Sequence, residues 1–439
     1  TIPVPYENPY KALMYTSGLD FLPGGDLAIC TVHGDVWLVK GIDEDLDKVT
    51  WKRFATGLFQ PLGLKVRDGD LFVLGRDRIT RLHDLNGDDE ADFYESFNAD
   101  IEIAGGGHSY ATCLETDPKG NFYFCKGADS PHTSHDGCVL KVSADGNELT
   151  VLATGFRFPN GLYALDEDLV SIADQEGNWV PASRIDFAGP GFFSGYMDTN
   201  HRETAPEKYG EPMCWLPQDI DNSCGGQAMG TGSEWGPLSN KLIHLSYGHC
   251  MMMYCLSEKV GDQWQGGAVR LPLQFLSGVM RGRFGPDGQL YLCGLRGWQT
   301  SAVRDGCLQR VRYTGEPFYN PTDLSVHQNG IRICFNEPLD EEFATDPESY
   351  AIEQWNYLWR KEYGSEDWSA NHPDQLGHDE VPFDEVHLSE DKKTVFIQIP
   401  DLKPVMQMQI RYNLDAEDGE LVKGVIHHTI HHLGAPYSF

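Results

Sequence analysis

Short apolar stretches alternate with polar turns along most of the chain, and one turn-plus-strand pattern recurs six times, at residues 23–30, 68–74, 120–125, 166–172, 240–246 and 287–293. Each copy has Asp, Asn, Pro or Gly at the turn and then a short run of β-branched, aromatic and aliphatic residues. Apart from one longer interval, the copies lie roughly 45–50 residues apart, the repeat expected of four-stranded propeller blades. The pattern predicts an all-β fold with a six-bladed β-propeller over residues 1–315, closed by an extended arm near residues 1–10. A generic all-β sandwich with similar turn spacing is the alternative.

The remaining residues, 316–439, have a different pattern. Three segments, at residues 330–340, 393–399 and 405–412, alternate apolar and polar positions as half-buried strands do. We therefore expect a separate immunoglobulin- or fibronectin-like β-sandwich after the propeller. Within the propeller, the longest insert covers about residues 190–232, and we expect it to form a lid or wall over one face.

The loops that lead into the first strand of each blade should meet at the mouth of one central channel. They bring Gln60, His108, Arg157 and Arg281, with Arg296 nearby, and these side chains could carry chemistry. A neutral imidazole such as that of His108 can act as a general base near pH 7. Arginines at the mouth of an acidic protein are suited to pairing with the carboxylates of an anionic cofactor or substrate. A purely structural role for His108 is the alternative.

The sequence has 66 Asp and Glu against 34 Lys and Arg, a net charge of −32. This charge disfavours nucleic acid or an anionic membrane as a partner, and no apolar run is long enough for a membrane span. The chain begins at Thr, as a processed secreted protein would, so we expect a periplasmic or extracellular location. It has 11 cysteines, of which Cys30, Cys125 and Cys293 occupy equivalent strand positions and are interpreted as unpaired core residues.

The clearest local motif is an EF-hand-type loop that begins at Asp84. Oxygen-bearing side chains stand at positions one, three, five, seven, nine and twelve: Asp84, Asn86, Asp88, Glu90, Asp92 and Glu95. Asp89 replaces the usual glycine at position six. The motif predicts a structural calcium ion, and an unoccupied acidic turn is the alternative.

A second candidate cation site is the turn that includes Gln175, Gly177 and Asn178, where carbonyl and side-chain oxygens could bind a hard cation. His132 and His135 could bind a transition metal with His108 or His33, although a solvated loop is the favoured interpretation.

Several of these segments together resemble a family of secreted planctomycete and verrucomicrobial proteins described as "putative membrane-bound dehydrogenase domains". The matching segments are residues 8–11, 58–64, 81–88, 174–177, 278–284 and 429–431. That family is distantly similar to soluble quinoprotein glucose and sorbosone dehydrogenases, whose six-bladed propeller holds pyrroloquinoline quinone and calcium over its channel. The resemblance implies that His108 is the base, with Gln60 and Arg157 beside it, and that the Gln175–Asn178 turn binds the cofactor calcium through backbone oxygens. The chain departs from the quinoproteins at Gly107, where they have an acidic residue, and at Phe158, where they have Asn.

These observations predict a secreted, carbohydrate-active oxidoreductase of the pyrroloquinoline-quinone-dependent sugar dehydrogenase type. Calcium and pyrroloquinoline quinone are the expected cofactors, with Gln175, Gly177, Asn178, Arg281 and Arg296 as cofactor-binding residues. Because no c-type haem attachment motif is present, electrons would pass to a separate acceptor. One alternative is a polysaccharide lyase or another non-redox carbohydrate enzyme, with Arg157 and Arg281 neutralising a uronate and His108 with Tyr110 or Tyr247 moving protons. A non-catalytic glycan-binding propeller is the other.

Overall fold

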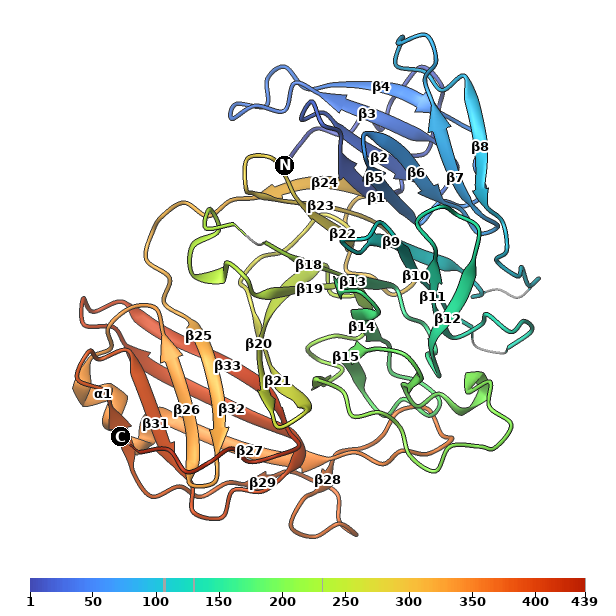
Figure 1. The fold of residues 1–439 in the computed structure, drawn as a ribbon. Helices are drawn as coiled ribbons and strands as arrows, with labels where there is room; N and C mark the ends of the chain where they lie inside the picture. Colours follow the sequence, from blue (N-terminus) through green and yellow to red (C-terminus); the bar gives the residue numbers. More distant parts are fainter. Residues whose placement is uncertain (106–107, 129–130, 231, 439) are drawn as a thin grey trace.

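The computed structural model describes residues 1–105, 108–128, 131–230 and 232–438. Strands dominate it, and most of them form small antiparallel sheets whose strands follow one another in chain order (Figure 1). The first sheet contains β1 (Thr16–Phe21), β2 (Leu27–Thr31), β3 (Val36–Lys40) and β4 (Thr50–Ala55). The second contains β5 (Gly63–Arg67), β6 (Asp70–Leu74), β7 (Ile79–His83) and β8 (Phe93–Asn98). An all-β fold is confirmed.

Four further sheets follow the same plan. The third contains β9 (Ala111–Thr116), β10 (Phe122–Lys126), β11 (Cys138–Val142), β12 (Leu149–Thr154) and a short parallel strand, β16 (Phe192–Phe193). The fourth contains β13 (Gly161–Asp166), β14 (Leu169–Asp174), β15 (Ser183–Ala188) and β17 (Cys214–Leu216). The fifth begins with β18 (Cys224–Met229), β19 (Leu242–Ser246), β20 (Met251–Val260) and β21 (Gln263–Arg270), and the sixth contains β22 (Gly278–Phe284), β23 (Leu290–Leu295) and β24 (Gly306–Val311).

The first strands of these six sheets contact one another in a closed ring, in the order β1, β5, β9, β13, β18, β22 and back to β1. This arrangement is propeller-like. Between the first two strands of each sheet, at least one residue has a positive φ: Gly25, Gly69, Gly120, Asp168, Asn240 and Gly288 are examples. The Gly, Asn and Asp that mark the sequence repeat are the residues that adopt this conformation at least cost.

Neighbouring sheets bury the strands between them. All residues of β2 and β10 are buried, and Cys30, Cys125 and Cys293 lie unpaired in these strands and in β23, which confirms their interpretation as core residues. The backbone N–H of Ile2 donates to the carbonyl of Leu308 in β24 (2.9 Å), so the N-terminal arm does pair with the last sheet. No helix in the described residues has the length and apolar character to cross a membrane.

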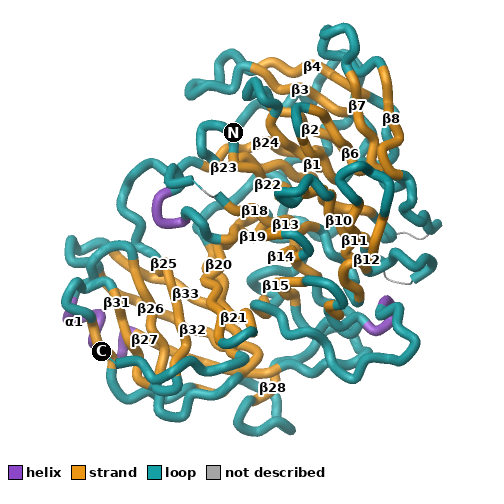
Figure 2. The backbone as a smooth tube through the Cα atoms, viewed as in Figure 1, coloured by secondary structure: helices purple, strands orange, loops and turns teal. Residues whose placement is uncertain are grey.

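The C-terminal region adds one separate sheet to the six already described, and it also extends the fifth sheet. Strands β25 (Pro321–His327), β26 (Gly330–Phe335), β31 (Thr394–Gln398) and β30 (Val386–Leu388) form the separate sheet. Strands β33 (Leu421–Ile430), β32 (Val405–Asp415), β27 (Tyr350–Asn356), β28 (Trp368–Ser369) and β29 (Asp379–Glu380) continue the fifth sheet, because β33 pairs with β21. The C-terminal strands form a block at the lower left in Figures 1 and 2, beside the short helix α1 (Glu341–Thr345).

The insert at residues 190–232 differs from the expected lid. It supplies β16, the 3-10 helix at Met197–Thr199, β17 and β18, so much of it belongs to the sheets of the ring. Two further 3-10 turns lie at Gly236–Leu238 and Pro347–Ser349.

Candidate functional site

The loops before the first strands and those between the second and third strands lie at the same end of the ring. Gln60 shortly precedes β5, and its Oε1 accepts a hydrogen bond from Arg76 Nη1 (3.1 Å), a residue of the β6–β7 loop. The Arg76 guanidinium also lies over the ring of Tyr110, 4.9 Å from its centroid. Gln60 is therefore linked through Arg76 to the segment that carries His108.

His108 and Arg157 contact the same aromatic ring. The imidazole of His108 is exposed and lies 4.8 Å from the Phe158 ring, centroid to centroid. The Arg157 guanidinium lies 4.3 Å from the centroid of that ring. The structure thus brings two of the three predicted catalytic residues together through Phe158 and joins Gln60 to them through Arg76 and Tyr110. Gly107, noted above as a departure from the quinoproteins, lies outside the described residues.

A buried ion pair anchors the His108 segment. Asp136 forms an ion pair with Lys126, and both side chains are fully buried. The same carboxylate accepts hydrogen bonds from Ser109 Oγ (2.9 Å) and from the backbone N–H groups of His132 (2.8 Å) and Thr133 (3.0 Å). Although burial opposes it, the bond from Lys126 keeps the pKa of Asp136 below its ordinary value. Asp136 therefore holds the residue next to His108 in place. Elsewhere on this loop, His135 Nδ1 accepts from the N–H of Glu102 (3.1 Å).

Arg157 is a nearly buried cation that lies on the Gln175–Asn178 turn. Its side chain is 8% exposed, and its Nη1 donates to the carbonyl of Glu176 (3.0 Å). The guanidinium rests directly against Gly177, where an added Cβ would overlap Arg157 Nε. Among the described residues, Arg157 Nε has no hydrogen-bond acceptor, and Glu176 interacts electrostatically with the guanidinium. Below it, Asp174 accepts from the N–H groups of Arg157 (2.7 Å) and Phe158 (2.8 Å), and burial raises the pKa of Asp174 to about 6.

The C-terminal region reaches over this turn between β27 and β28. The carbonyl of Gly177 accepts from the N–H of Gly364 (3.0 Å) and from that of Val180 (3.1 Å). Asn178 Nδ2 donates to the carbonyl of Lys361 (3.1 Å), and the half-exposed ring of Tyr363 lies 5.0 Å from the Arg157 guanidinium. Arg157 consequently contacts two aromatic rings, one from the propeller-like ring of sheets and one from the C-terminal region.

These contacts test the calcium predicted at the turn. The carbonyl of Glu176 is bonded to Arg157, that of Gly177 accepts two backbone N–H groups, and Gln175 Oε1 accepts from Ser223 Oγ (3.0 Å). A guanidinium, which is itself a cation, covers the turn. Calcium requires several oxygen ligands that are free to coordinate it. The residues present therefore do not fit a calcium ion at this turn.

The other predicted cofactor-binding arginines lie in different surroundings. Arg281 is buried, and its Nε and Nη2 both donate to the carbonyl of Leu62 (3.0 and 2.8 Å), while Nη1 donates to that of Met280 (2.6 Å). It therefore joins two parts of the ring inside the channel and has few donors left for a cofactor. Arg296 is exposed just after the end of β23. Deeper in the channel, Arg283 pairs with Glu115 (2.5 Å) and Asp20 (3.6 Å).

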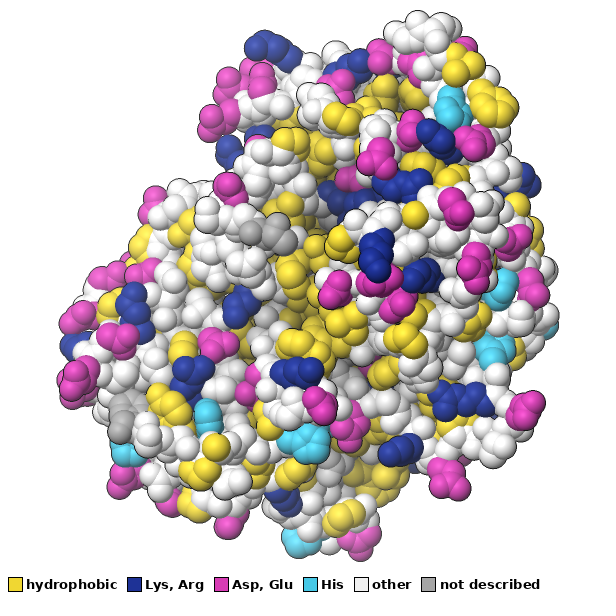
Figure 3. Space-filling model, viewed as in Figure 1, with side chains coloured by type: hydrophobic (Ala, Val, Ile, Leu, Met, Phe, Trp, Pro, Cys, Tyr) yellow, Lys and Arg dark blue, Asp and Glu magenta, His cyan; other side chains and the backbone are white. Residues whose placement is uncertain are grey.

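The described residues leave little space beside the two channel arginines Arg281 and Arg283. The cavity beside Arg281 and Arg283 measures only about 10 Å³, room for about one water molecule. The site is consequently a surface at the mouth of the ring, and ligands would approach from outside. In Figure 3, Lys and Arg side chains gather in the hollow between the upper and lower halves of the face shown, with Asp and Glu spread around it.

The EF-hand-type loop lies between β7 and β8, away from the mouth. Asp84 Oδ1 accepts from the N–H of Gly87 (2.7 Å), Asp88 Oδ1 accepts from that of Glu90 (3.0 Å), and Asp89 takes a positive φ of 63° at the position usually held by Gly. Asn86 and Asp92 also bond within the loop, Asp92 Oδ2 accepting from the N–H of Leu85 (2.7 Å). Glu95, predicted at position twelve, lies in β8 and instead contacts His83 Nε2 (2.7 Å).

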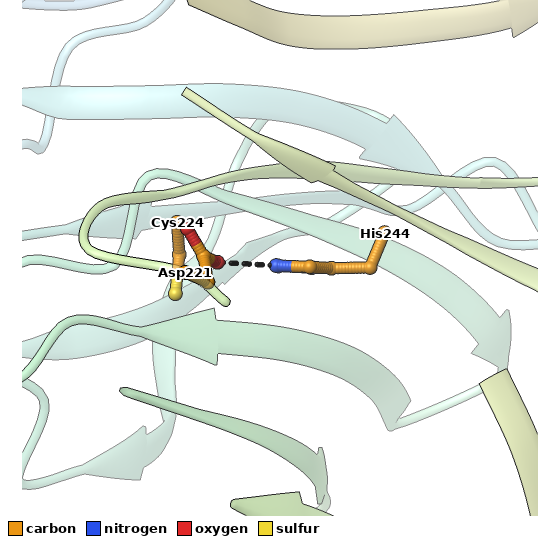
Figure 4. Close-up of side chains that lie close together, drawn as sticks. All are labelled: Asp221, Cys224 and His244. Carbon is orange, nitrogen blue, oxygen red and sulfur yellow. Dashed lines mark hydrogen bonds and ion pairs between the residues drawn. The ribbon is translucent and has the colours of Figure 1, made fainter. Parts of the chain in front are cut away.

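Another cluster of potential metal ligands is buried in the fifth sheet, where Cys224 of β18 and His244 of β19 lie close to Asp221, which precedes β18. Figure 4 shows the Asp221 carboxylate directed at His244, with Cys224 beside it. Asp221 bonds to His244 Nε2 (2.7 Å) and Ser246 Oγ (2.7 Å), and the Cys224 thiol donates to the carbonyl of Asp174 (3.3 Å). Burial raises the pKa of Cys224 well above its ordinary value, so the thiol stays protonated. The network is a buried anchor for these strands.

No known protein family and no curated protein matches the sequence. Solved structures match the fold. A protein described as "putative oxidoreductase (glucose dehydrogenase)" from Thermus thermophilus aligns with a TM-score of 0.55 at 17% identity, covering 68% of this chain and 97% of that one. The aldose sugar dehydrogenase from Streptomyces coelicolor, solved in its PQQ-bound form, aligns with a TM-score of 0.53 at 15% identity, covering 68% and 94%. The chain therefore shares the fold of sugar dehydrogenases.

Sequence reasoning missed several residues of this mouth. Arg76 stands in a loop after a second strand, whereas the loops that precede first strands supplied the predicted site residues. Phe158 stands out in the sequence only as a departure from the quinoproteins, although its ring is what His108 and Arg157 share. Tyr363 belongs to a region that was expected to form a separate domain. Aromatic residues beside predicted site residues are the one signal that could have indicated Phe158.

Proposed function

We propose that this protein is a secreted sugar oxidoreductase, built on a six-bladed β-propeller with a C-terminal β-sandwich. One observation supports the proposal: His108 and Arg157 both contact the aromatic ring of Phe158 at the mouth of the propeller-like sheets. These sheets have the fold of sugar dehydrogenases. The substrate would be a carbohydrate, the location periplasmic or extracellular, and the electrons would pass to a separate acceptor.

His108 would accept the proton of a sugar hydroxyl group, because its imidazole is exposed at the mouth and backed by Phe158. Gln60 would orient the substrate, since Arg76 fixes its amide oxygen and leaves the amide nitrogen to donate. Arg157 and Arg76 would bind the carboxylates of pyrroloquinoline quinone, which supplies the hydride acceptor when bound. The arginines fit this anionic group, whereas the calcium that accompanies it in the quinoproteins does not fit the Gln175–Asn178 turn.

Dye-linked oxidation of aldoses by the full chain, with and without added quinone, tests the proposal. We expect turnover that His108→Ala reduces by about 100-fold or more, the usual contribution of a general base. His372→Ala, which removes an exposed imidazole of the C-terminal region, is the matched control and should leave turnover unchanged. Turnover by His108→Ala equal to that of the control, or no oxidation of any aldose, would refute the proposal.

A polysaccharide lyase is the second candidate, because Arg157 is a nearly buried cation whose Nε has no acceptor among the described residues, so it could neutralise a uronate. Tyr110 and Tyr247, which interact electrostatically, could transfer the protons, and burial raises the pKa of Tyr247 to about 12. New ultraviolet absorbance from polyuronates without added cofactor would favour this function. Glycan affinity that survives His108→Ala, without turnover of any substrate, would instead indicate a non-catalytic binding propeller.

A further inference from the structure

The Gln175–Asn178 turn and Arg157 form one unit, in which the positive guanidinium already bonds to a backbone oxygen of the turn. The guanidinium donates to the carbonyl of Glu176 and lies flat against Gly177. Only a glycine permits this approach, because a Cβ at residue 177 would overlap three atoms of the guanidinium, namely Nε, Cζ and Nη1.

The C-terminal region holds this unit in place. Residues 360–364 run beside the turn and make three hydrogen bonds to it: Gly364 N–H to Gly177, Trp179 N–H to Arg360, and Asn178 Nδ2 to Lys361. Tyr363 contacts the Arg157 guanidinium from the C-terminal region at 5.0 Å, and Phe158 contacts it from the propeller side at 4.3 Å. A planar guanidinium is well suited to such stacking.

One donor of Arg157 is nevertheless left over. Arg157 is 8% exposed, and among the described residues its Nε has no hydrogen-bond acceptor. The hydrogen bond that Glu176 makes to Arg157 comes from its backbone carbonyl (3.0 Å) and not from its carboxylate. A nearly buried cation with an unsatisfied donor is costly unless a ligand completes its surroundings.

We infer that the Arg157 guanidinium takes the place of a divalent cation on this turn, and that the mouth binds a carboxylate-bearing ligand without calcium. The inference rests on the site of the proposed function and differs from what the quinoprotein resemblance implies. The ligand chemistry is a carboxylate next to a ring, because Arg157 offers charge and Phe158 and Tyr363 offer aromatic faces. That carboxylate could belong to the quinone or to a uronate sugar.

Binding to the full chain, measured by calorimetry without turnover, tests the inference. The titrants are pyrroloquinoline quinone, trigalacturonate and, as a neutral control, maltotriose, each with a chelator and again with calcium, at a temperature where tryptophan fluorescence shows the chelated protein to be folded. We expect one of the two carboxylate ligands to bind with the same affinity under both conditions. Which one binds identifies the carboxylate as that of a cofactor or of a substrate.

Variants then test Arg157 itself. Arg157→Gln should weaken binding about tenfold or more, as expected for loss of a charge-assisted hydrogen bond. Gly177→Ala keeps the arginine but displaces its guanidinium, so it should weaken binding too, whereas Gly24→Ala, which meets nothing within 4 Å, should not. The Gly177→Ala and Gly24→Ala pair decides the question if Arg157→Gln fails to fold.

Three results would overturn the inference: binding that needs calcium, wild-type affinity in both Arg157→Gln and Gly177→Ala, or no binding of either carboxylate ligand. These outcomes are separable from failure of the proposed function. Calcium-independent carboxylate binding without sugar oxidation would uphold the subsite and refute the oxidoreductase. Sugar oxidation that requires calcium would do the reverse.

Discussion

The buried pair between Lys126 and Asp136 allows a quantitative prediction. Asp136→Ala removes an acceptor that serves Lys126 Nζ, Ser109 Oγ and two backbone N–H groups, and it leaves the fully buried ammonium group without this carboxylate. Breaking a buried ion pair on one side costs about 3–5 kcal/mol, so we expect the free energy of unfolding to fall by that amount. Asp136→Asn keeps an oxygen acceptor and should cost less, about 2 kcal/mol.

Urea unfolding followed by tryptophan fluorescence measures this difference. The matched control is Glu167→Ala, which breaks the exposed pair between Lys119 and Glu167 (2.5 Å) and should cost at most about 1 kcal/mol. Replacing both partners, Lys126→Met with Asp136→Leu, should recover much of the loss, because no unpaired charge remains.

Acid titration gives an independent check of the same pair. The pKa of Asp136 is lowered on folding, so its contribution is complete above the ordinary value of 3.8 and is lost as the pH falls through the lower folded-state value. A destabilisation by Asp136→Ala no larger than that of Glu167→Ala would refute the reasoning. It would mean that Lys126 finds solvent or another partner when Asp136 is absent.

Three other changes have defined outcomes. Asp84→Asn should abolish a calcium-dependent rise in melting temperature if the loop binds calcium as predicted, and a calcium response equal to that of wild type would exclude this loop as its source. The affinity of the protein for a carboxylate ligand should fall as the pH rises through about 7, because Glu176 then ionises beside Arg157. Glu176→Gln should reduce this pH dependence. A pH profile of binding equal to that of wild type would contradict the role given to Glu176. Tyr363→Ala should weaken the same binding several-fold through loss of the stacked ring, while Phe343→Ala, an exposed aromatic on α1, should not; equal affinities, measured by calorimetry, would show that Tyr363 has no part in the site.

The repeat could be read from the sequence because each copy carries its own local cause. A residue that tolerates positive φ sits at each inner turn, and apolar residues follow it on both faces of a strand that neighbouring sheets bury. The closed ring then follows from the number of copies. The continuation of the fifth sheet into β33 could not be predicted, because pairing of edge strands β21 and β33 depends on where the C-terminal region lies in space.

Part of the candidate site could likewise be proposed from the sequence, and part could not. His108, Gln60 and Arg157 could be identified because side-chain chemistry is written in the sequence, and their contacts with Phe158 and Arg76 follow from equivalent positions in adjacent repeats. The calcium predicted at the Gln175–Asn178 turn depended instead on backbone carbonyls, which every residue possesses. Whether such a carbonyl is free to bind a metal depends on its tertiary partners, and here one partner of the Gly177 carbonyl is the N–H of Gly364 (3.0 Å), which belongs to the distant C-terminal region. Since Arg157 bonds to the Glu176 carbonyl and the C-terminal segment bonds to that of Gly177, the geometry of this turn depends on the two parts of the chain jointly.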